Sequence, residues 1–184
     1  MLRDVLAFKI GHDLGDYAPR TCYVEVVIND DYKGVYVLME KIKRDKNRVD
    51  IATLLPQNVS GDELTGGYLL RVDKLDGNDY PGWTATPVPQ LAGANDITFQ
   101  YDDPEGAELA EAQRTYIRTY IKEFQSSLTA SNFANPTIGY QKHLDIPSAI
   151  NFILVNEIGK NIDGYIFSTY LYKDKDSDGG KLHL

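Results

Sequence analysis

The sequence predicts an α+β fold built from antiparallel β-hairpins and two main amphipathic helices. Apolar residues recur at a helical period in two long segments, β-branched residues alternate in several short ones, and helices do not alternate regularly with strands. The chain has 184 residues, 42% of them hydrophobic and 25% charged, which is enough for one domain with its own core. We therefore expect residues 1–184 to form a single domain.

The N-terminal part is predicted to be a helix followed by a hairpin. Apolar residues at helical spacing indicate an amphipathic helix over residues 2–14, and Gly15 lies where a glycine commonly ends a helix. Residues 21–28 alternate and are rich in β-branched side chains, and residues 35–42 return as a second strand after the polar turn 29–31. These two strands should pair as an antiparallel hairpin.

The middle of the chain is predicted to hold further strands around an irregular stretch. Residues 66–73 enter a strand through a glycine pair, and residues 97–101 alternate weakly as another strand. Between them, residues 75–96 contain several prolines and glycines without a helical period. We expect a loop there, with at most a short strand.

One long amphipathic helix is predicted from Pro104 to about Leu128. Asp103 can cap the free amides of its first turn, and Pro104 suits the first helical position. A single apolar stripe should then pack against the rest of the domain. The stripe consists of Leu109, Ala112, Tyr116, Ile117, Tyr120, Ile121, Phe124 and Leu128.

A second helix is predicted to begin at residues 145–147, where an aspartate precedes Ile-Pro, and to end near residues 159–161. Beyond it, residues 167–172 and 181–184 are expected to form two strands joined by the polar turn 174–180. The helix has an apolar face with the same spacing as the first. This face consists of Ile150, Ile153, Leu154 and Ile158.

Two acidic residues near the end of this second helix are candidates for chemistry. Glu157 falls on the apolar face, so its carboxylate should be either paired, for example with Lys160, or at the edge of a cleft. Asp163 comes just after the helix and before Gly164. An aspartate at such a position is usually an ordinary turn residue.

The polar turn near the C-terminus contains a candidate calcium site. Asp174, Asp176 and Asp178 occupy alternate positions before Gly179, as in the opening of a calcium loop. Such a loop expects a bidentate glutamate at its twelfth position, which would be residue 185, one beyond the sequence. An acidic turn without a metal is the alternative interpretation.

Composition disfavours several classes of partner. The net charge is −8 and the pI is near 4.8, so the overall field repels nucleic acid and anionic membranes. No apolar run is long enough to span a membrane, residues 1–4 do not open a secretory signal, and Cys22 is the only cysteine. We therefore expect no nucleic acid, no membrane span and no disulfide within the chain. One local run of basic residues is either a solvated face or a phosphate site. It consists of Lys41, Lys43, Arg44, Lys46 and Arg48.

Five strings of the sequence resemble successive segments of the CotH (spore coat protein H) kinase-like family. The resemblance implies an atypical kinase, remotely similar to the protein-kinase fold, that uses ATP and magnesium to phosphorylate protein serine or threonine hydroxyls. Because family members include spore-coat kinases and secreted proteins, it also implies an extracellular or cell-surface location. The strings are residues 2–4, 17–21, 32–50, 65–74 and 156–165, in the family's order.

The resemblance also implies roles for individual residues. Asp163 resembles the catalytic aspartate of the family's Asn-x-Asp motif, which orients or deprotonates the acceptor hydroxyl. Ser168 follows at the spacing where a protein-kinase catalytic loop carries its metal-binding asparagine. Arg71 corresponds best to the strand lysine that holds the ATP phosphates, Lys74 is the alternative, and Glu40 is a potential partner for either cation.

The sequence departs from the family at two positions and at both of its ends. Position 71 is arginine rather than lysine, and position 168 is serine rather than asparagine. Family members also have β-structure before the segment that matches residue 1, and they continue into a Trp-Asp-x-Asp-like segment whose aspartates bind the metal. We therefore expect residues 1–184 to be an incomplete domain that is inactive alone. The alternative is a non-catalytic secreted or surface module with a degenerate kinase-like fold.

Overall fold

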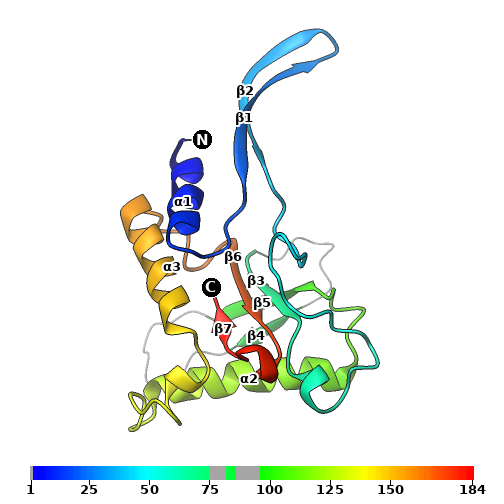
Figure 1. Cartoon of the computed structure of the whole chain (residues 1–184), viewed down its shortest axis with the longest axis vertical. Helices are drawn as coiled ribbons and strands as arrows, with labels where there is room; N and C mark the ends of the chain where they lie inside the picture. The colour runs from blue at the N-terminus through cyan, green and yellow to red at the C-terminus, as the bar shows by residue number, and fades with distance from the viewer. Residues whose placement is uncertain (1, 75–81, 86–95) are drawn as a thin grey trace.

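The computed structural model describes residues 2–74, 82–85 and 96–184 (Figure 1). Strands β1 and β2 form a hairpin, and the other strands form a five-stranded sheet of order β4-β5-β3-β6-β7 in which every pair is antiparallel. The expected α+β class is therefore confirmed. The helices and strands are α1 (Leu2–Asp13), β1 (Thr21–Ile28), β2 (Asp31–Met39), β3 (Tyr68–Val72), β4 (Trp83–Ala85), β5 (Ile97–Asp103), α2 (Glu111–Thr129), α3 (Ile146–Gly159), β6 (Thr169–Lys173) and β7 (Leu182–His183), with 3-10 turns η1 (Asp62–Leu64), η2 (Tyr140–Lys142) and η3 (Asp176–Asp178).

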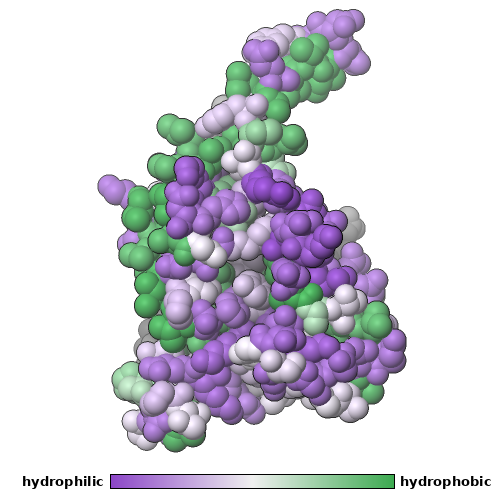
Figure 2. Space-filling view, viewed as in Figure 1, coloured by the Kyte–Doolittle hydropathy of each residue, from purple (hydrophilic) through white to green (hydrophobic). Residues whose placement is uncertain are grey.

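The hairpin projects away from the body of the molecule (Figure 1). Its second strand begins at Asp31 rather than at residue 35, because Asn29 and Asp30 complete the turn with φ angles of 52° and 62°. Two consecutive residues with positive φ match the twist of paired strands, and Asn and Asp tolerate this conformation. Figure 2 shows hydrophobic residues both on this hairpin and along the edge formed by α1 and α3.

Strand β3 lies at the centre of the sheet, and its side chains alternate between the two faces. On one face, Tyr68 and Leu70 pack with Ile117 and Ile121 of α2. On the other face, Leu69 packs with hydrophobic residues of the segment between β2 and η1. Because β3 is covered on both faces, it fixes the position of the residues that follow it.

Helix α2 begins at Glu111, seven residues later than expected. Asp103 does not cap it, because Asp103 is still part of β5 and pairs with Leu69 of β3. The side chain of Gln113 performs the capping function instead, and its Oε1 accepts a hydrogen bond from the backbone N of Ala110 at 2.8 Å.

The expected apolar stripe of α2 is buried at its centre but not at its end. Ile117 and Ile121 are 0% and 1% exposed, respectively, whereas Leu128 is 43% exposed. Leu109 is buried but lies before the helix begins. The predicted orientation of the helix is therefore confirmed, whereas the prediction that Leu128 packs with the rest of the stripe is wrong.

Helix α3 begins where the sequence predicts. Asp145 caps it, and its Oδ1 accepts a hydrogen bond from the backbone N of Ser148 at 2.9 Å. Its predicted apolar face is largely exposed, however, while Ser148, Ala149 and Asn156 are buried. The exposed residues of that face are Ile150, Ile153, Leu154 and Ile158.

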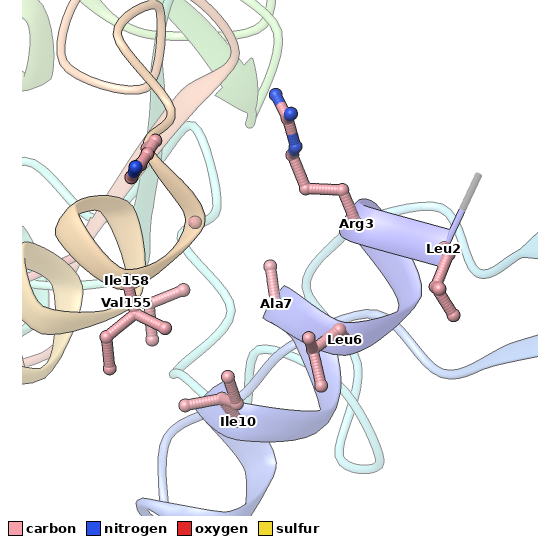
Figure 3. A pocket seen from close by; sticks show the side chains of 9 residues that line it. Leu2, Arg3, Leu6, Ala7, Ile10, Val155 and Ile158 are labelled. Atoms are coloured by element: carbon pink, nitrogen blue, oxygen red, sulfur yellow. The ribbon is translucent and has the colours of Figure 1, made fainter.

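An apolar groove of about 470 Å³ separates α1 from α3 (Figure 3). Leu6, Ala7 and Ile10 line it from α1, and Val155 and Ile158 line it from α3.

None of the helices described is long and apolar enough to cross a membrane. The only cysteine of the sequence, Cys22, is exposed and forms no disulfide.

Candidate functional site

A shallow pocket lies where β3 ends beside the start of β6. Val72 pairs with Thr169 in the β3–β6 register, so the residues after β3 lie next to the residues before β6. The pocket has a volume of about 340 Å³ and brings together three residues singled out from the sequence: Lys74, Asp163 and Ser168. The full lining consists of Asp73, Lys74, Asn161, Asp163, Gly164, Phe167 and Ser168.

Asp73 connects the two sides of this pocket. Its Oδ2 accepts a hydrogen bond from Oγ of Ser168 at 3.1 Å, and its Oδ1 accepts one from the backbone N of Lys74 at 2.8 Å. The Lys74 ammonium lies 4.7 Å from the centroid of the Phe167 ring, a favourable cation–π distance. The sequence analysis did not single out Asp73, although its place at the end of a strand was visible.

The loop between α3 and β6 carries Asp163 at the edge of the pocket. Its backbone O accepts hydrogen bonds from the backbone N of Ile166 at 3.0 Å and of Phe167 at 2.9 Å. The Asp163 side chain is exposed, and its carboxylate accepts no hydrogen bond from any described residue.

Arg71 lies outside the pocket, one strand position from Val72. Its Nε donates to Oε1 of Gln100 on β5 at 2.9 Å, and its Nη2 donates to the same oxygen. Gln100 Nε2 in turn donates to the backbone O of Asp73 and Lys74 at 3.2 and 2.9 Å. Arg71 thus contacts the side chain that fixes the backbone of the pocket.

Glu40 is paired with two other cations rather than placed in the pocket. Its Oε1 accepts from Nε of Arg48 at 2.7 Å, and its Oε2 accepts from Nε of Arg20 at 3.1 Å. The hydrogen bond with Arg20, followed by that with Arg48, lowers the pKa of the Glu40 carboxyl to about 2. The cations that Glu40 pairs with among the described residues are therefore Arg20 and Arg48, whereas the family resemblance suggested Arg71 or Lys74.

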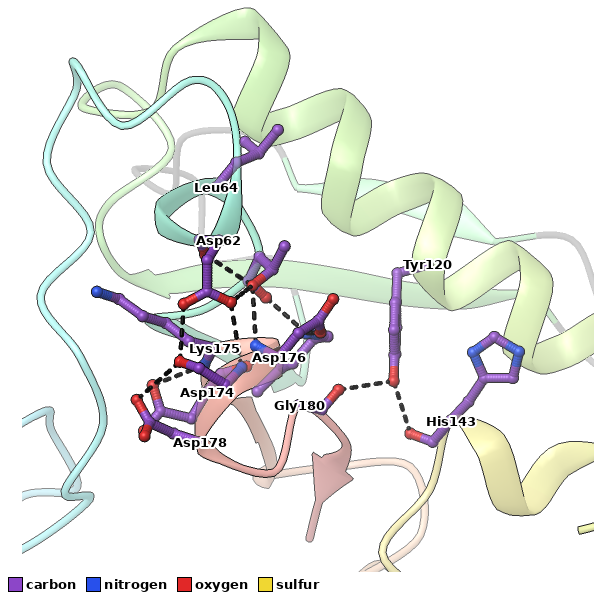
Figure 4. A network of polar contacts seen from close by, with 12 residues as sticks. Asp62, Leu64, Tyr120, His143, Asp174, Lys175, Asp176, Asp178 and Gly180 are labelled. Carbon is purple, nitrogen blue, oxygen red and sulfur yellow. Dashed lines mark hydrogen bonds and ion pairs between the residues drawn. The ribbon is translucent and has the colours of Figure 1, made fainter. Parts of the chain in front are cut away.

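The expected calcium ligands are occupied by protein groups (Figure 4). Asp174 Oδ1 accepts from the backbone N of Ala52 at 3.0 Å, and Asp176 Oδ1 accepts from Nζ of Lys173 at 2.9 Å. Within residues 2–74, 82–85 and 96–184, no three His, Cys, Asp or Glu side chains form a group suited to a metal ion. The contacts observed for Asp174 and Asp176 are those of a structural acidic turn.

Glu157 is on the exposed surface of α3 and not in a buried pair. Its Oε1 accepts a hydrogen bond from the hydroxyl of Tyr165 at 2.8 Å, and this interaction is the first cause of the raised pKa of Tyr165. The expected partner, Lys160, instead ends the helix in a left-handed conformation with φ of 48°.

A larger cavity adjoins the pocket and shares Asn161, Gly164, Phe167 and Ser168 with it. It has a volume of about 460 Å³ and lies between α1, α3 and the start of β6. The hydroxyl of Tyr17 is buried there, and it forms no hydrogen bond with any described residue. Burial is the main cause that raises the pKa of Tyr17 to about 12, so this hydroxyl is a protonated donor at neutral pH.

A family model described as CotH kinase protein matches residues 1–183. The chain therefore belongs to the CotH kinase family. A search of curated proteins gives no match.

Proposed function

We propose that this domain serves ATP- and magnesium-dependent transfer of phosphate to serine or threonine hydroxyls of a protein. One observation carries the proposal: Asp163, Lys74 and Ser168 line the same pocket in a chain that matches the CotH kinase family over residues 1–183. Two of these residues come from the α3–β6 loop and one from the end of β3, so local sequence does not explain their proximity.

Each pocket residue has a property that suits this role. The Lys74 ammonium supplies positive charge for a phosphate group, and the unoccupied carboxylate of Asp163 can accept or orient the proton of an acceptor hydroxyl. The cavity beside the pocket, where no described residue forms a hydrogen bond with the Tyr17 hydroxyl, offers a place for the nucleoside. Arg71 supports the pocket through Gln100, so we assign phosphate binding to Lys74 rather than to Arg71.

Magnesium would be held by oxygen ligands, and the pocket offers the Asp73 carboxylate and the Ser168 hydroxyl. This donor set fits a cation that keeps several of its waters and is shared with substrate phosphates. The ion would neutralise phosphate charge during transfer. We place the protein at an extracellular or spore surface, by analogy with its family.

A non-catalytic binding module is the second candidate function. The favouring observation is that Ser168, at the position of a metal-binding asparagine, already donates its hydroxyl to Asp73. The two functions differ in nucleotide binding, because a module that has lost catalysis has no need to retain a magnesium–ATP site.

Nucleotide binding by the whole chain tests the proposal. Magnesium–ATP should raise the melting temperature, and Lys74→Ala should weaken its affinity about tenfold or more, because the phosphate loses a charge-assisted contact. Lys9→Ala is the control, since Lys9 is exposed on α1 and, among the described residues, forms an ion pair with Asp13 alone. No thermal shift with millimolar magnesium–ATP would contradict the proposal and favour the binding module.

Phosphate transfer tests the role of Asp163. In a preparation that transfers phosphate from ATP to protein, Asp163→Asn should nearly abolish transfer while the nucleotide affinity changes by no more than a few-fold. A proton-accepting group acts mainly in the transition state, whereas phosphate ligands also hold the ground state. Arg71→Ala and Lys74→Ala should weaken nucleotide binding first, Lys74→Ala more. Near-normal transfer by Asp163→Asn would identify Asp163 as a turn residue.

A further inference from the structure

The buried residue Asn156 of α3 contacts the start of the loop that carries Asp163. Its Oδ1 accepts a hydrogen bond from Nδ2 of Asn161 at 3.0 Å, and its backbone O accepts one from the backbone N of Asn161 at 2.9 Å. Its Nδ2 donates to the backbone O of Phe152 at 2.9 Å, which fixes the orientation of the amide. Only 6% of the Asn156 surface is exposed, so its amide is held within the fold while its partner Asn161 is exposed.

Gly164 lies directly against the same amide. A Cβ atom at Gly164 would come within 2.0 Å of Oδ1 of Asn156 and within 2.5 Å of Nδ2 of Asn161. No side chain fits into this space unless those groups move. The backbone O of Gly164 also accepts a hydrogen bond from Oγ1 of Thr169 at 2.7 Å, which ties the loop to β6.

These contacts hold the loop on both sides of Asp163. Asn161 lies two residues before it, and Gly164 follows it directly. The Asp163 side chain is exposed, and its carboxylate accepts no hydrogen bond from a described residue, so the backbone of the loop sets the direction of its Cα–Cβ bond and the region that the carboxylate can reach. A side chain that fixes this backbone therefore also fixes that region.

We propose that Asn156 is a positioning residue for Asp163, acting through its bond to Asn161 and its contact with Gly164. The inference rests on the proposed function for its consequence in catalysis. The positioning itself can be measured without any activity. Sequence reasoning gave Asn156 no role, because its side chain meets the loop only in the folded chain.

Amide hydrogen exchange on the whole chain tests the positioning. Asn156→Ala should speed exchange of the Ile166 and Phe167 amides, which bond to Asp163, about tenfold or more, because the loop loses its anchor. Asn161→Ala should also speed exchange of these amides. Because it truncates an exposed side chain, it can replace Asn156→Ala as the test if Asn156→Ala does not fold. Asn151→Ala, on the same helix, is the control. Unchanged exchange of the Ile166 and Phe167 amides in both Asn156→Ala and Asn161→Ala would overturn the inference.

A double-mutant cycle tests the contact with Gly164. Gly164→Ala should shift the urea midpoint strongly in the wild-type background and less in the Asn156→Ala background, where the obstructing Oδ1 is gone. Equal shifts in the two backgrounds would mean that this amide does not limit the loop.

Transfer kinetics separate positioning from general loss of structure. Asn156→Ala should lower kcat about tenfold or more and leave the magnesium–ATP affinity within about threefold. Absence of magnesium–ATP binding by the wild-type chain would speak against the proposed function, and the exchange experiment would still decide the role of Asn156. Normal kcat together with fast loop exchange would overturn the catalytic consequence alone.

Discussion

The ammonium group of Lys173 is buried between the carboxylate of Asp176 and the ring of Tyr120. Its Nζ lies 2.9 Å from Oδ1 of Asp176 and 4.8 Å from the Tyr120 centroid, and it donates to the backbone O of Thr65 at 2.6 Å. Burial lowers the pKa of Lys173, while the hydrogen bond to Asp176 opposes this effect. Lys173 therefore joins α2, the segment before β3 and the β6–β7 turn.

This arrangement predicts different effects of two neighbouring aspartates. Asp176→Ala leaves a buried cation without its counter-ion and should lower the free energy of unfolding by about 1 to 3 kcal/mol, less than for a fully buried pair because Asp176 is itself exposed. Asp178→Ala should change it by less than about 0.5 kcal/mol. Urea unfolding with and without calcium measures both. If Asp176→Ala and Asp178→Ala lowered the free energy of unfolding equally, and only when calcium is present, the calcium-site interpretation would be restored.

The centre and the end of the α2 stripe should respond differently to truncation. Ile121→Ala should cost about 2 to 5 kcal/mol because the side chain is 1% exposed and packs against β3. Leu128→Ala, on the same helix, should cost much less because that side chain is 43% exposed. Denaturant unfolding of the two variants compares them directly. A loss below about 0.5 kcal/mol for Ile121→Ala would mean that the stripe faces solvent.

The ion pairs of Glu40 should make stability depend on pH in the acid range. Because its pKa is lowered to about 2 in the folded chain, the stabilisation is present above the ordinary carboxyl pKa and is lost as the pH falls towards 2. Wild type should therefore be more stable than Glu40→Gln at pH 6, and the gap should close between about pH 4.5 and 2. Urea midpoints over this range measure the gap, with Glu25→Gln as the control. A gap that does not change with pH would contradict the assignment.

His143 should remain neutral at pH values where an ordinary histidine is protonated. It is 3% exposed, and its ring contacts Tyr120 edge-on with centroids 5.1 Å apart. Burial, followed by the charge of Lys142, lowers its pKa below the usual 6.5. Its contribution to stability is present above pH 6.5 and is lost as the pH falls through the lower folded pKa. An NMR titration of the imidazole protons with a midpoint at or above 6.5 would refute this.

Several features were predictable from the sequence because they depend on residues close together in the chain. Asp145 caps α3 through an amide three residues away, and Asn29 and Asp30 turn the hairpin by their own backbone conformation. The α2 stripe follows from helical geometry. Within the site, the resemblance located Asp163, Lys74 and Ser168, and the structure brings them together.

The remaining features depend on contacts between distant segments. Asp73 meets Ser168, 95 residues away, because β3 and β6 pair in a particular register. α2 starts late because Asp103 is held in the sheet by Leu69. The sequence by itself determined which segments form helices and strands, since hydrophobic period and capping are local. Only the tertiary structure decided which faces are covered and which charges meet, because burial and ion pairing depend on what the rest of the chain places beside each residue.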